Sequence, residues 1–360
     1  MLEAVPPEAI VQLLSAAVRR GASDVHLIGG FPPTVRCHGV LVQLDAPLLD
    51  ADRLHDLLDG LCPEHLARRL HDEMSLDFAF ALNVDDQLIR FRINLFYAGR
   101  RLGACLRIIP ARIPDFGWAE FPIELAERLA ACRDGMVIVT GPTGSGKTTT
   151  LAMIVNLINQ AGGQLIITIE EPLEYEFPRA ACSVVTQREV GIDVPTFADG
   201  LKYGLRQDPD VILVGEIRDY ETAQIALSAA ETGHLVLTTL HTRDAKGAIS
   251  RYADLFPHEA QRDVRSQLAL SLRAIIAQRL LPDIEPGQKS HLALEVLWNT
   301  YPIASAIRVG KLESIDNYLT TSREDGMCGI DESVRRLFDD GRISRLVAEQ
   351  NVRDPSALGR

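Results

Sequence analysis

The chain has 360 residues, of which 46% are hydrophobic and 24% are charged. These proportions are typical of globular proteins and exclude a disordered or fibrous chain, and the length is natural for two domains. The formal net charge of −12 argues against non-specific binding to nucleic acid or to an anionic membrane surface. We therefore expect a globular protein without a nucleic-acid partner.

The six cysteines stand far apart and form no C-x-x-C pair. This spacing is typical of reduced thiols rather than of a zinc ribbon or a disulfide framework. Acidic residues precede the first basic residue, which is wrong for a secretory signal peptide. No apolar stretch approaches the roughly eighteen residues of a membrane span. We therefore expect a cytoplasmic protein.

The first 109 residues are predicted to form a small α+β domain. Apolar residues at helical spacing predict an amphipathic helix over residues 8–20, and helical patterning returns over residues 51–71. Short apolar or alternating runs predict strands over residues 24–28, 34–37, 40–42, 75–81, 88–94 and 102–109.

A segment with two prolines, residues 110–117, predicts a linker to a second domain. Over residues 118–282, apolar strands alternate with helices, which indicates an α/β domain with a mainly parallel sheet covered on both faces. The strands are expected over residues 136–140, 164–169, 184–186, 211–214 and 235–240. Residues 283–360 are predicted to be mostly helical and to end in a polar tail.

One segment matches the phosphate-loop pattern G-x-x-x-x-G-K-[ST], between a predicted strand and a predicted helix. Its glycines let backbone N–H groups turn toward phosphate oxygens, and the helix N-terminus adds its positive end. Lys147 can reach the β- and γ-phosphates, while the Thr148 hydroxyl can bind Mg²⁺. The predicted nucleotide-binding residues are Gly141, Pro142, Thr143, Gly144, Ser145, Gly146, Lys147, Thr148 and Thr149.

Two glutamates follow apolar strands, Glu216 after residues 211–214 and Glu170 after residues 164–169. Beside a phosphate loop, a carboxylate in this place can hold the Mg²⁺ water shell or activate the attacking water. Because the carboxyl ends of the strands line the ligand crevice, we expect both glutamates to face the γ-phosphate. By spacing alone, a solvated acidic turn explains the Glu170 segment equally well.

Two histidines, His234 and His241, flank the predicted strand 235–240. They must lie at opposite ends of this strand, so they cannot both touch one atom. Either can hydrogen-bond the γ-phosphate or simply cap the strand.

Four segments in this order resemble the sequence boxes of the secretion ATPase superfamily. Residues 141–148 resemble its Walker A box, 168–174 its Asp box, 208–219 its Walker B box and 231–234 its His box. The sequence is most similar to the PilT-type branch, the type IV pilus retraction motors, over nearly the whole chain. The resemblance implies a PAS-like N-terminal domain, a RecA-like ATPase domain and assembly into a ring-shaped homohexamer.

The resemblance also implies roles for individual residues. In this family Glu170 would activate water, Glu216 would associate with Mg²⁺ and His234 would sense the phosphate; the base and metal roles of the two glutamates stay open. Arginines of the N-terminal domain would reach the phosphate, since a guanidinium fork suits a multiply charged anion. By motif match these arginines are Arg92, Arg100 and Arg107.

The function implied by the resemblance is Mg²⁺-dependent hydrolysis of ATP that drives pilus retraction. The motor would act through an inner-membrane platform protein, as a peripheral protein at the cytoplasmic face. Two positions depart from the pattern: Glu171 replaces the usual Asp, and Ala304 replaces an arginine in a segment tied to retraction. A pilus assembly or type II/type IV secretion ATPase is therefore an alternative. A catalytically silent accessory subunit is another, although the intact acidic and histidine residues argue against it.

Overall fold

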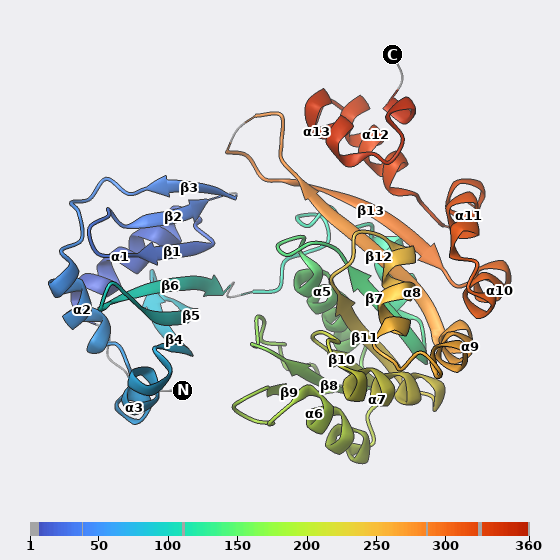
Figure 1. The fold of residues 1–360 in the computed structure, drawn as a ribbon, viewed down its shortest axis with the longest axis horizontal. Helices are drawn as coiled ribbons and strands as arrows, with labels where there is room; N and C mark the ends of the chain where they lie inside the picture. Colours follow the sequence, from blue (N-terminus) through green and yellow to red (C-terminus); the bar gives the residue numbers. More distant parts are fainter. Residues whose placement is uncertain (1–6, 38, 110–111, 286, 323–325, 359–360) are drawn as a thin grey trace. The chain divides into compact units, whose positions relative to one another are not determined.

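The computed structural model describes residues 7–37, 39–109, 112–285, 287–322 and 326–358 (Figure 1). They fall into two compact units. The first is Met1–Arg112 with Gly287–Lys289, and the second is Ile113–Pro286 with Ser290–Arg360. The first two residues of the predicted linker and His38 lie outside the described residues.

The first unit contains an antiparallel sheet with the strand order β3-β2-β1-β6-β5-β4. Its elements are α1 (Glu8–Arg19), β1 (Asp24–Leu27), β2 (Thr34–Cys37), β3 (Val40–Gln43), α2 (Ala51–Asp59), α3 (Glu64–Glu73), β4 (Ser75–Val84), β5 (Gln87–Ala98) and β6 (Arg101–Ile109). The strands predicted for this unit are confirmed. The predicted helical run over residues 51–71 is wrong in one respect. It is two helices, because Pro63 cannot donate a backbone hydrogen bond inside a helix.

One face of this sheet is buried and the other carries polar side chains. In β5, Phe91, Ile93 and Leu95 are fully buried, whereas the intervening Arg92 and Asn94 are partly exposed. This period of two is that of a sheet with one covered face. The buried side chains form one core with apolar residues of α1, α2 and α3.

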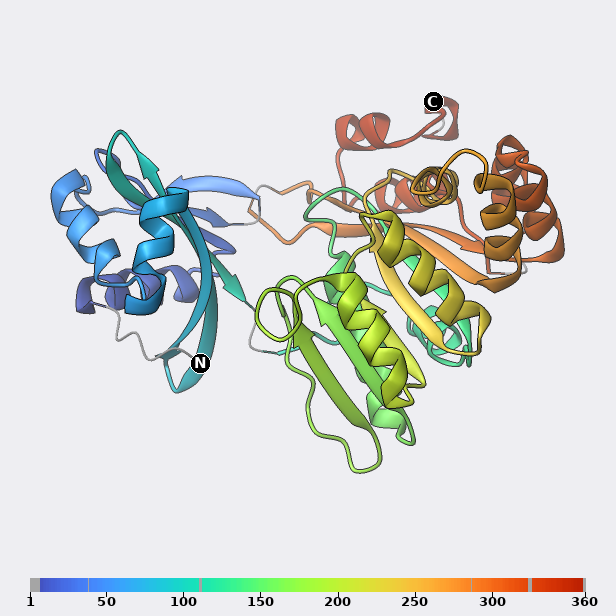
Figure 2. The same cartoon turned by 60° about the horizontal axis from the view of Figure 1, so that its bottom comes forward.

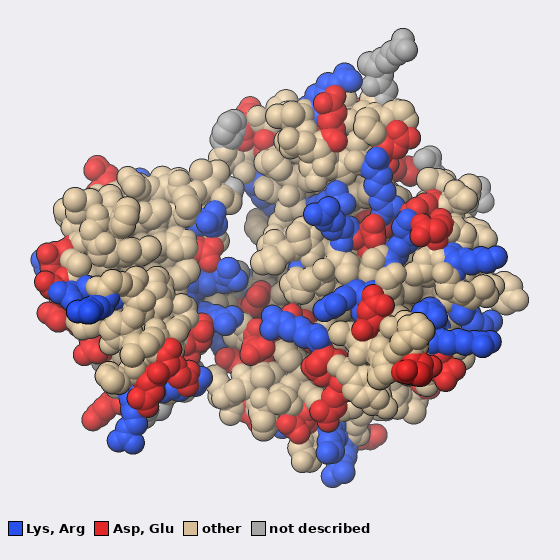
Figure 3. All heavy atoms as spheres, in the orientation of Figure 1, with Lys and Arg blue, Asp and Glu red and all other residues tan. Residues whose placement is uncertain are grey.

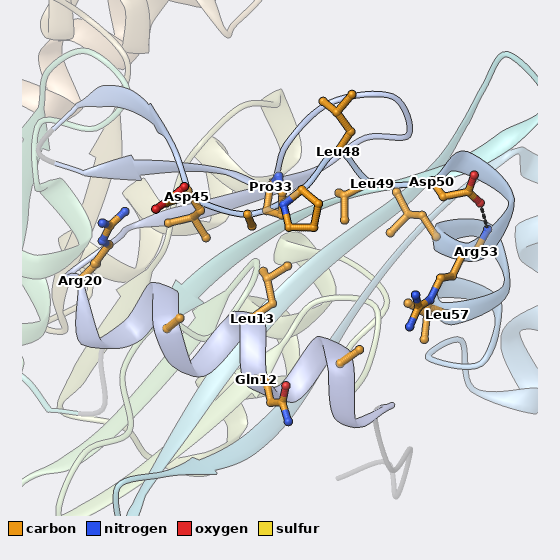
Figure 4. Close-up of a pocket in the computed structure, with 16 residues that line it drawn as sticks. Gln12, Leu13, Arg20, Pro33, Asp45, Leu48, Leu49, Asp50, Arg53 and Leu57 are labelled. Carbon is orange, nitrogen blue, oxygen red and sulfur yellow. Dashed lines mark hydrogen bonds between the residues drawn. The ribbon is translucent and has the colours of Figure 1, made fainter.

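A cavity of about 840 Å³ lies in the first unit between α1, α2 and residues 44–50 (Figure 4). Leucines such as Leu13, Leu49 and Leu57 line it, and Arg20 and Arg53 lie at its two ends. None of the site residues predicted from the sequence lines this cavity.

The second unit contains a sheet with the order β13-β12-β7-β11-β10-β8-β9, parallel except for the β12–β13 pair. Its strands are β7 (Gly135–Thr140), β8 (Leu165–Glu170), β9 (Val184–Glu189), β10 (Val211–Val214), β11 (Leu235–Leu240), β12 (Leu272–Leu281) and β13 (His291–Trp298). Its α-helices are α4 (Ile123–Ala130), α5 (Lys147–Ala161), α6 (Phe197–Gly204), α7 (Tyr220–Glu231), α8 (Ala245–Asp254), α9 (Gln261–Ser271), α10 (Tyr301–Val309), α11 (Ile315–Thr321), α12 (Ile330–Asp339) and α13 (Arg345–Asn351). Short 3₁₀ turns are η1 (Leu205–Gln207), η2 (Leu312–Ser314) and η4 (Pro355–Leu358).

The central strands of this sheet are buried on both faces. Every residue of β7, β10 and β11 is buried, as expected for parallel strands between two helical layers. Helices α4 and α5 pack on each other, while α6, α7, α8 and α9 form a second contiguous set (Figure 2). The predicted mainly parallel sheet is therefore confirmed.

The prediction that the chain is mostly helical from residue 283 is wrong at its start. Residues His291–Trp298 form β13, and Leu272–Leu281 form β12, which was not among the predicted strands. Both are largely apolar segments, whose periodicity does not distinguish a buried strand from a buried helix. Helices α10 to α13 follow as expected.

Charged side chains of both signs are interspersed over the face of the second unit seen in Figure 3. None of the helices in the described part of the chain has both the length and the apolar character needed to cross a bilayer.

Candidate nucleotide site

The phosphate loop has the predicted context of strand, loop and helix. It leaves β7 after Thr140 and enters α5 at Lys147. Gly146 caps the helix with a positive φ of 85°, a conformation that other residues adopt at a cost. A side chain at Gly141 would overlap the carbonyl oxygen of Gln278, so only glycine fits there. The glycines of the sequence pattern therefore allow this segment to form a compact loop.

Lys147 is held inside this loop. Its side chain is buried, and Nζ donates hydrogen bonds of 3.1 Å to the carbonyl oxygens of Gly141 and Pro142. Burial lowers the pKa of Lys147, while the charges of Glu216 and Glu174 act in the opposite direction. The ammonium thus lies where the charge of a bound triphosphate would be stabilised.

Four neighbouring parallel strands, β7, β11, β10 and β8, end at the same edge of the sheet. The phosphate loop follows β7, His241 follows β11, Glu216 follows β10 after one glycine, and Glu170 ends β8. The carboxyl ends of parallel strands form the ligand crevice of such sheets. The fold therefore brings together groups that lie far apart in the sequence.

His241 connects the phosphate loop to Glu216. Its Nδ1 lies 3.5 Å from Nζ of Lys147, and its Nε2 lies 3.3 Å from Oε2 of Glu216. Burial and the charge of Lys147 lower the pKa of His241, which favours the neutral imidazole, although Glu216 opposes this shift. The other oxygen of Glu216 lies 2.6 Å from Nη2 of Arg218. Glu216 is thus buried between two basic groups.

Glu170 has different surroundings. It is 4% exposed, and burial raises its pKa to about 7. Among the described residues, none hydrogen-bonds its Oε1 atom. A carboxylate with a pKa near neutrality and a free oxygen suits a general base. Glu170 and Glu216 lie at neighbouring strand ends, since Val214 pairs with Ile169. That both face the γ-phosphate stays a prediction.

The structure does not place His234, the phosphate sensor that the resemblance implies, beside the phosphate loop of its own chain. His234 precedes β11, and its carbonyl oxygen accepts a hydrogen bond from the backbone N–H of Gly135, where β7 begins. A strand of this length separates it from His241 by about 20 Å. His234 lines a cavity of about 740 Å³ at the amino ends of the strands, and His241 takes the place at the phosphate loop. The sequence alone does not decide which histidine lies at the phosphate loop, because one precedes the predicted strand and the other follows it.

The three predicted arginines do not form one cluster. Arg92 and Arg107 are paired across β5 and β6 and lie side by side on the polar face of the first unit. Arg92 lies 3.5 Å from Asp77, and Arg107 donates a 3.0 Å hydrogen bond to Asp24. Arg100 lies in the turn between β5 and β6, about 20 Å along the hairpin. That any of them reaches a nucleotide stays a prediction.

The remaining loop residues complete the site. Thr148 lies in the first turn of α5, and the Thr149 hydroxyl is hydrogen-bonded at 2.9 Å to the hydroxyl of Tyr175. The Thr140 hydroxyl joins the end of β7 to Thr242, 2.8 Å away, beside His241. The hydroxyl of Thr148 and the carboxylate of Glu216 are the hard oxygen ligands that Mg²⁺ prefers, so these residues fit the ion.

Sequence reasoning missed Gln278, whose buried side chain contacts the phosphate loop from β12. The sequence could have indicated this contact, because Gln278 is a lone amide at the end of the apolar run Ala274–Ala277. Buried amides are expected to have hydrogen-bond partners.

Comparison with known proteins identifies the family of the chain. The chain matches the family described as type II/IV secretion system protein over residues 3–311. The type IV pilus retraction ATPase PilT of Pseudomonas aeruginosa is 37% identical over 96% of this chain and 98% of its own length. A putative type II secretion system protein E of Escherichia coli is 49% identical over 76% of this chain and 55% of that protein.

The structure also matches a solved structure over nearly its whole length. The pilus retraction motor PilT with bound ADP superposes with a TM-score of 0.84 and 41% identity, covering 96% of this chain and 97% of that one. The expected fold, an N-terminal domain followed by a RecA-like ATPase domain, is thereby confirmed. The chain is therefore an ATPase that belongs to the family of type II/IV secretion system proteins.

Proposed function

We propose that this ATPase drives the retraction of type IV pili and thereby twitching motility. The observation that carries the proposal is an intact site in a chain that matches a pilus retraction ATPase along 96% of its length. The motor would work as a homohexamer on an inner-membrane platform protein, at the cytoplasmic face of that membrane. Force would come from closure of one domain on the other around the nucleotide.

The site residues divide the chemistry of γ-phosphate hydrolysis among them. Glu170, with its pKa near 7, takes the proton of the attacking water. Lys147 and the loop N–H groups offset the negative charge that develops on the phosphoryl oxygens. His241, neutral and close to both Lys147 and Glu216, hydrogen-bonds the terminal phosphate. Arg92 and Arg107 are the candidates for contacts from the first unit.

Mg²⁺ would be held by the Thr148 hydroxyl and, directly or through water, by the Glu216 carboxylate. When bound, it neutralises phosphate charge and orients the triphosphate. The salt bridge from Arg218 and the proximity of His241 hold the Glu216 carboxylate in place for this role.

A gene deletion in the host tests the proposed direction of work. Loss of the gene is expected to leave cells with abundant surface pili that no longer twitch. Complementation with the wild-type gene restores movement, whereas Lys147→Ala does not, because the variant lacks the cation that stabilises the phosphate charge. Purified Lys147→Ala should release phosphate at less than about one hundredth of the wild-type rate, equivalent to nearly 3 kcal/mol in the barrier.

Other outcomes would overturn the proposal in distinct ways. Cells without pili would indicate an assembly motor, and unchanged pili and motility would indicate a secretion ATPase or an accessory subunit. Phosphate release by purified Lys147→Ala at the wild-type rate would contradict the assigned site itself.

A secretion or assembly ATPase is the second candidate function. Two observations favour it: the 49% identity to the putative type II secretion protein, and Ala304 in the segment tied to retraction. That segment is α10, in which Ile303 and Ile307 are fully buried and Ala304 packs against the core. The missing arginine therefore changes what α10 offers a partner, while the helix itself keeps its packing.

A further inference from the structure

The end of β12 places a buried amide directly under the phosphate loop. β12 runs parallel to β7, and the last pair of residues between them is Ala277 with Thr140. Gln278 therefore lies beside Gly141, where the loop begins. Its side chain is 1% exposed and continues an apolar run. Such an amide destabilises the fold unless its polar atoms find partners.

Both ends of the Gln278 amide are engaged by the loop and its helix. Nε2 donates a 2.5 Å hydrogen bond to the carbonyl oxygen of Ser145, and Oε1 accepts a 3.1 Å hydrogen bond from the Thr150 hydroxyl. The orientation of the amide follows from chemistry, because the Ser145 carbonyl can only accept. One side chain thus joins β12 to the loop and to α5.

The glycines of the loop pack against the same residue. A Cβ at Gly146 would lie 3.3 Å from Nε2 of Gln278, and a Cβ at Gly141 would overlap its carbonyl oxygen. At these two positions the loop therefore packs closely against Gln278.

The hydrogen bond to Ser145 fixes the direction of a neighbouring donor. The Ser145 carbonyl and the Gly146 N–H belong to one planar trans peptide unit and point in opposite directions. Because the carbonyl points at Gln278, the Gly146 N–H points away from the Gln278 amide. Inward-facing N–H groups are what a phosphate loop offers to phosphate oxygens.

We propose that Gln278 is a positioning residue for nucleotide binding, which acts by orienting the Ser145–Gly146 peptide unit of the phosphate loop. This inference rests on the proposed ATP hydrolysis and assigns Gln278 no contact with ATP or the attacking water. Its loss should weaken ATP binding and leave the chemical step largely intact. The expected signature is a change in KM rather than in kcat.

The test is Gln278→Glu, measured on the full chain by phosphate release and by binding of a fluorescent ATP analogue. The carboxylate has nearly the same shape as the amide but offers no donor to Ser145. KM should therefore rise about tenfold, which is the effect of one lost hydrogen bond. The value of kcat should change less than about threefold. Lowering the pH from 8 to 6 protonates the buried glutamate and restores a donor. The ratio of the variant's KM to the wild-type KM should therefore fall toward one.

Asn299→Asp is the matched control. The Asn299 amide donates to the carbonyl oxygens of Ala269 and Leu272 at 3.0 and 2.9 Å, at the other end of β12. The same chemical change there should lower Tm without raising KM. Thr150→Val removes only the second contact of Gln278 and should raise KM by about threefold. This variant tests the proposal if Gln278→Glu does not fold.

The outcomes separate this inference from the proposed function. Unchanged KM in folded Gln278→Glu or in Thr150→Val, or an equal rise in Asn299→Asp, overturns the positioning role. A wild-type chain that hydrolyses no ATP contradicts the proposed function instead. Analogue binding by wild type and Gln278→Glu would still decide the role of Gln278.

Discussion

Glu170 is the residue whose protonation should control the rate of hydrolysis. With a pKa of about 7, it is protonated in acid and becomes a competent base as the pH rises. We therefore expect kcat to rise from pH 5.5 to about 8 and then to level off, as measured by phosphate release. Glu170→Gln should lose more than about 99% of the wild-type kcat. A flat profile for the wild type would show that Glu170 is not the base.

The same burial predicts a gain in stability for that variant. The folded state binds the Glu170 proton more tightly than the unfolded chain, whose carboxyl keeps the ordinary pKa of 4.5. This contribution to stability is complete below pH 4.5 and is lost as the pH rises through about 7, which amounts to about 1.4 kcal/mol per pKa unit. Glu170→Gln should therefore raise Tm at pH 8 and have little effect at pH 5. Equal shifts at both pH values would point to packing instead of charge.

The two histidines around β11 form a matched pair for testing the site. His241 lies 3.5 Å from Lys147 and 3.3 Å from Glu216, whereas His234 lies at the opposite end of the strand. His241→Ala should lower kcat by roughly tenfold to a hundredfold, and His234→Ala should leave it within about threefold of wild type, as measured by phosphate release. The reverse result would mean that His234 acts at a site its own chain does not form.

At the scale of single elements, the sequence predicts best where local chemistry decides the structure. The phosphate loop, the acids at the carboxyl ends of β8 and β10, and the parallel strands were predicted, because glycine pattern and strand–turn–helix order are local signals. β12 and β13 were not, because strand pairing depends on residues far apart in the chain. Gln278 was missed with β12, since its partners are 133 and 128 residues away.

The direction of β11 explains why His241 rather than His234 lies at the phosphate loop. A sequence shows that two histidines flank a strand, but only the strand direction in the sheet shows which one meets the phosphate loop. β11 lies parallel to β7, so its carboxyl end, and with it His241, reaches the loop. In a parallel sheet the histidine after the strand is thus the better candidate.

At the scale of the whole chain, one imidazole joins distant segments of the second unit. His291, at the start of β13, is buried between two carboxyl groups. Its Nδ1 lies 3.1 Å from Glu120, which precedes α4, and its Nε2 lies 2.6 Å from Asp283, which follows β12. Arg342, between α12 and α13, lies 2.7 Å from the same Glu120. The cluster therefore holds the β12–β13 hairpin to both ends of the ATPase unit.

Removing that imidazole should destabilise the unit while leaving the nucleotide site intact. His291→Leu leaves the carboxyl groups of Glu120 and Asp283 facing an apolar side chain, and breaking such a cluster is strongly unfavourable. We expect Tm to fall by about 5 °C or more, with His291→Gln less affected because its amide still donates a hydrogen bond. The exposed His258→Gln serves as the control and should leave Tm unchanged. Because the cluster lies outside the loop and its acids, KM for ATP should stay at the wild-type value in all three variants below their melting range. A shift in KM without a shift in Tm would instead make His291 part of the nucleotide site.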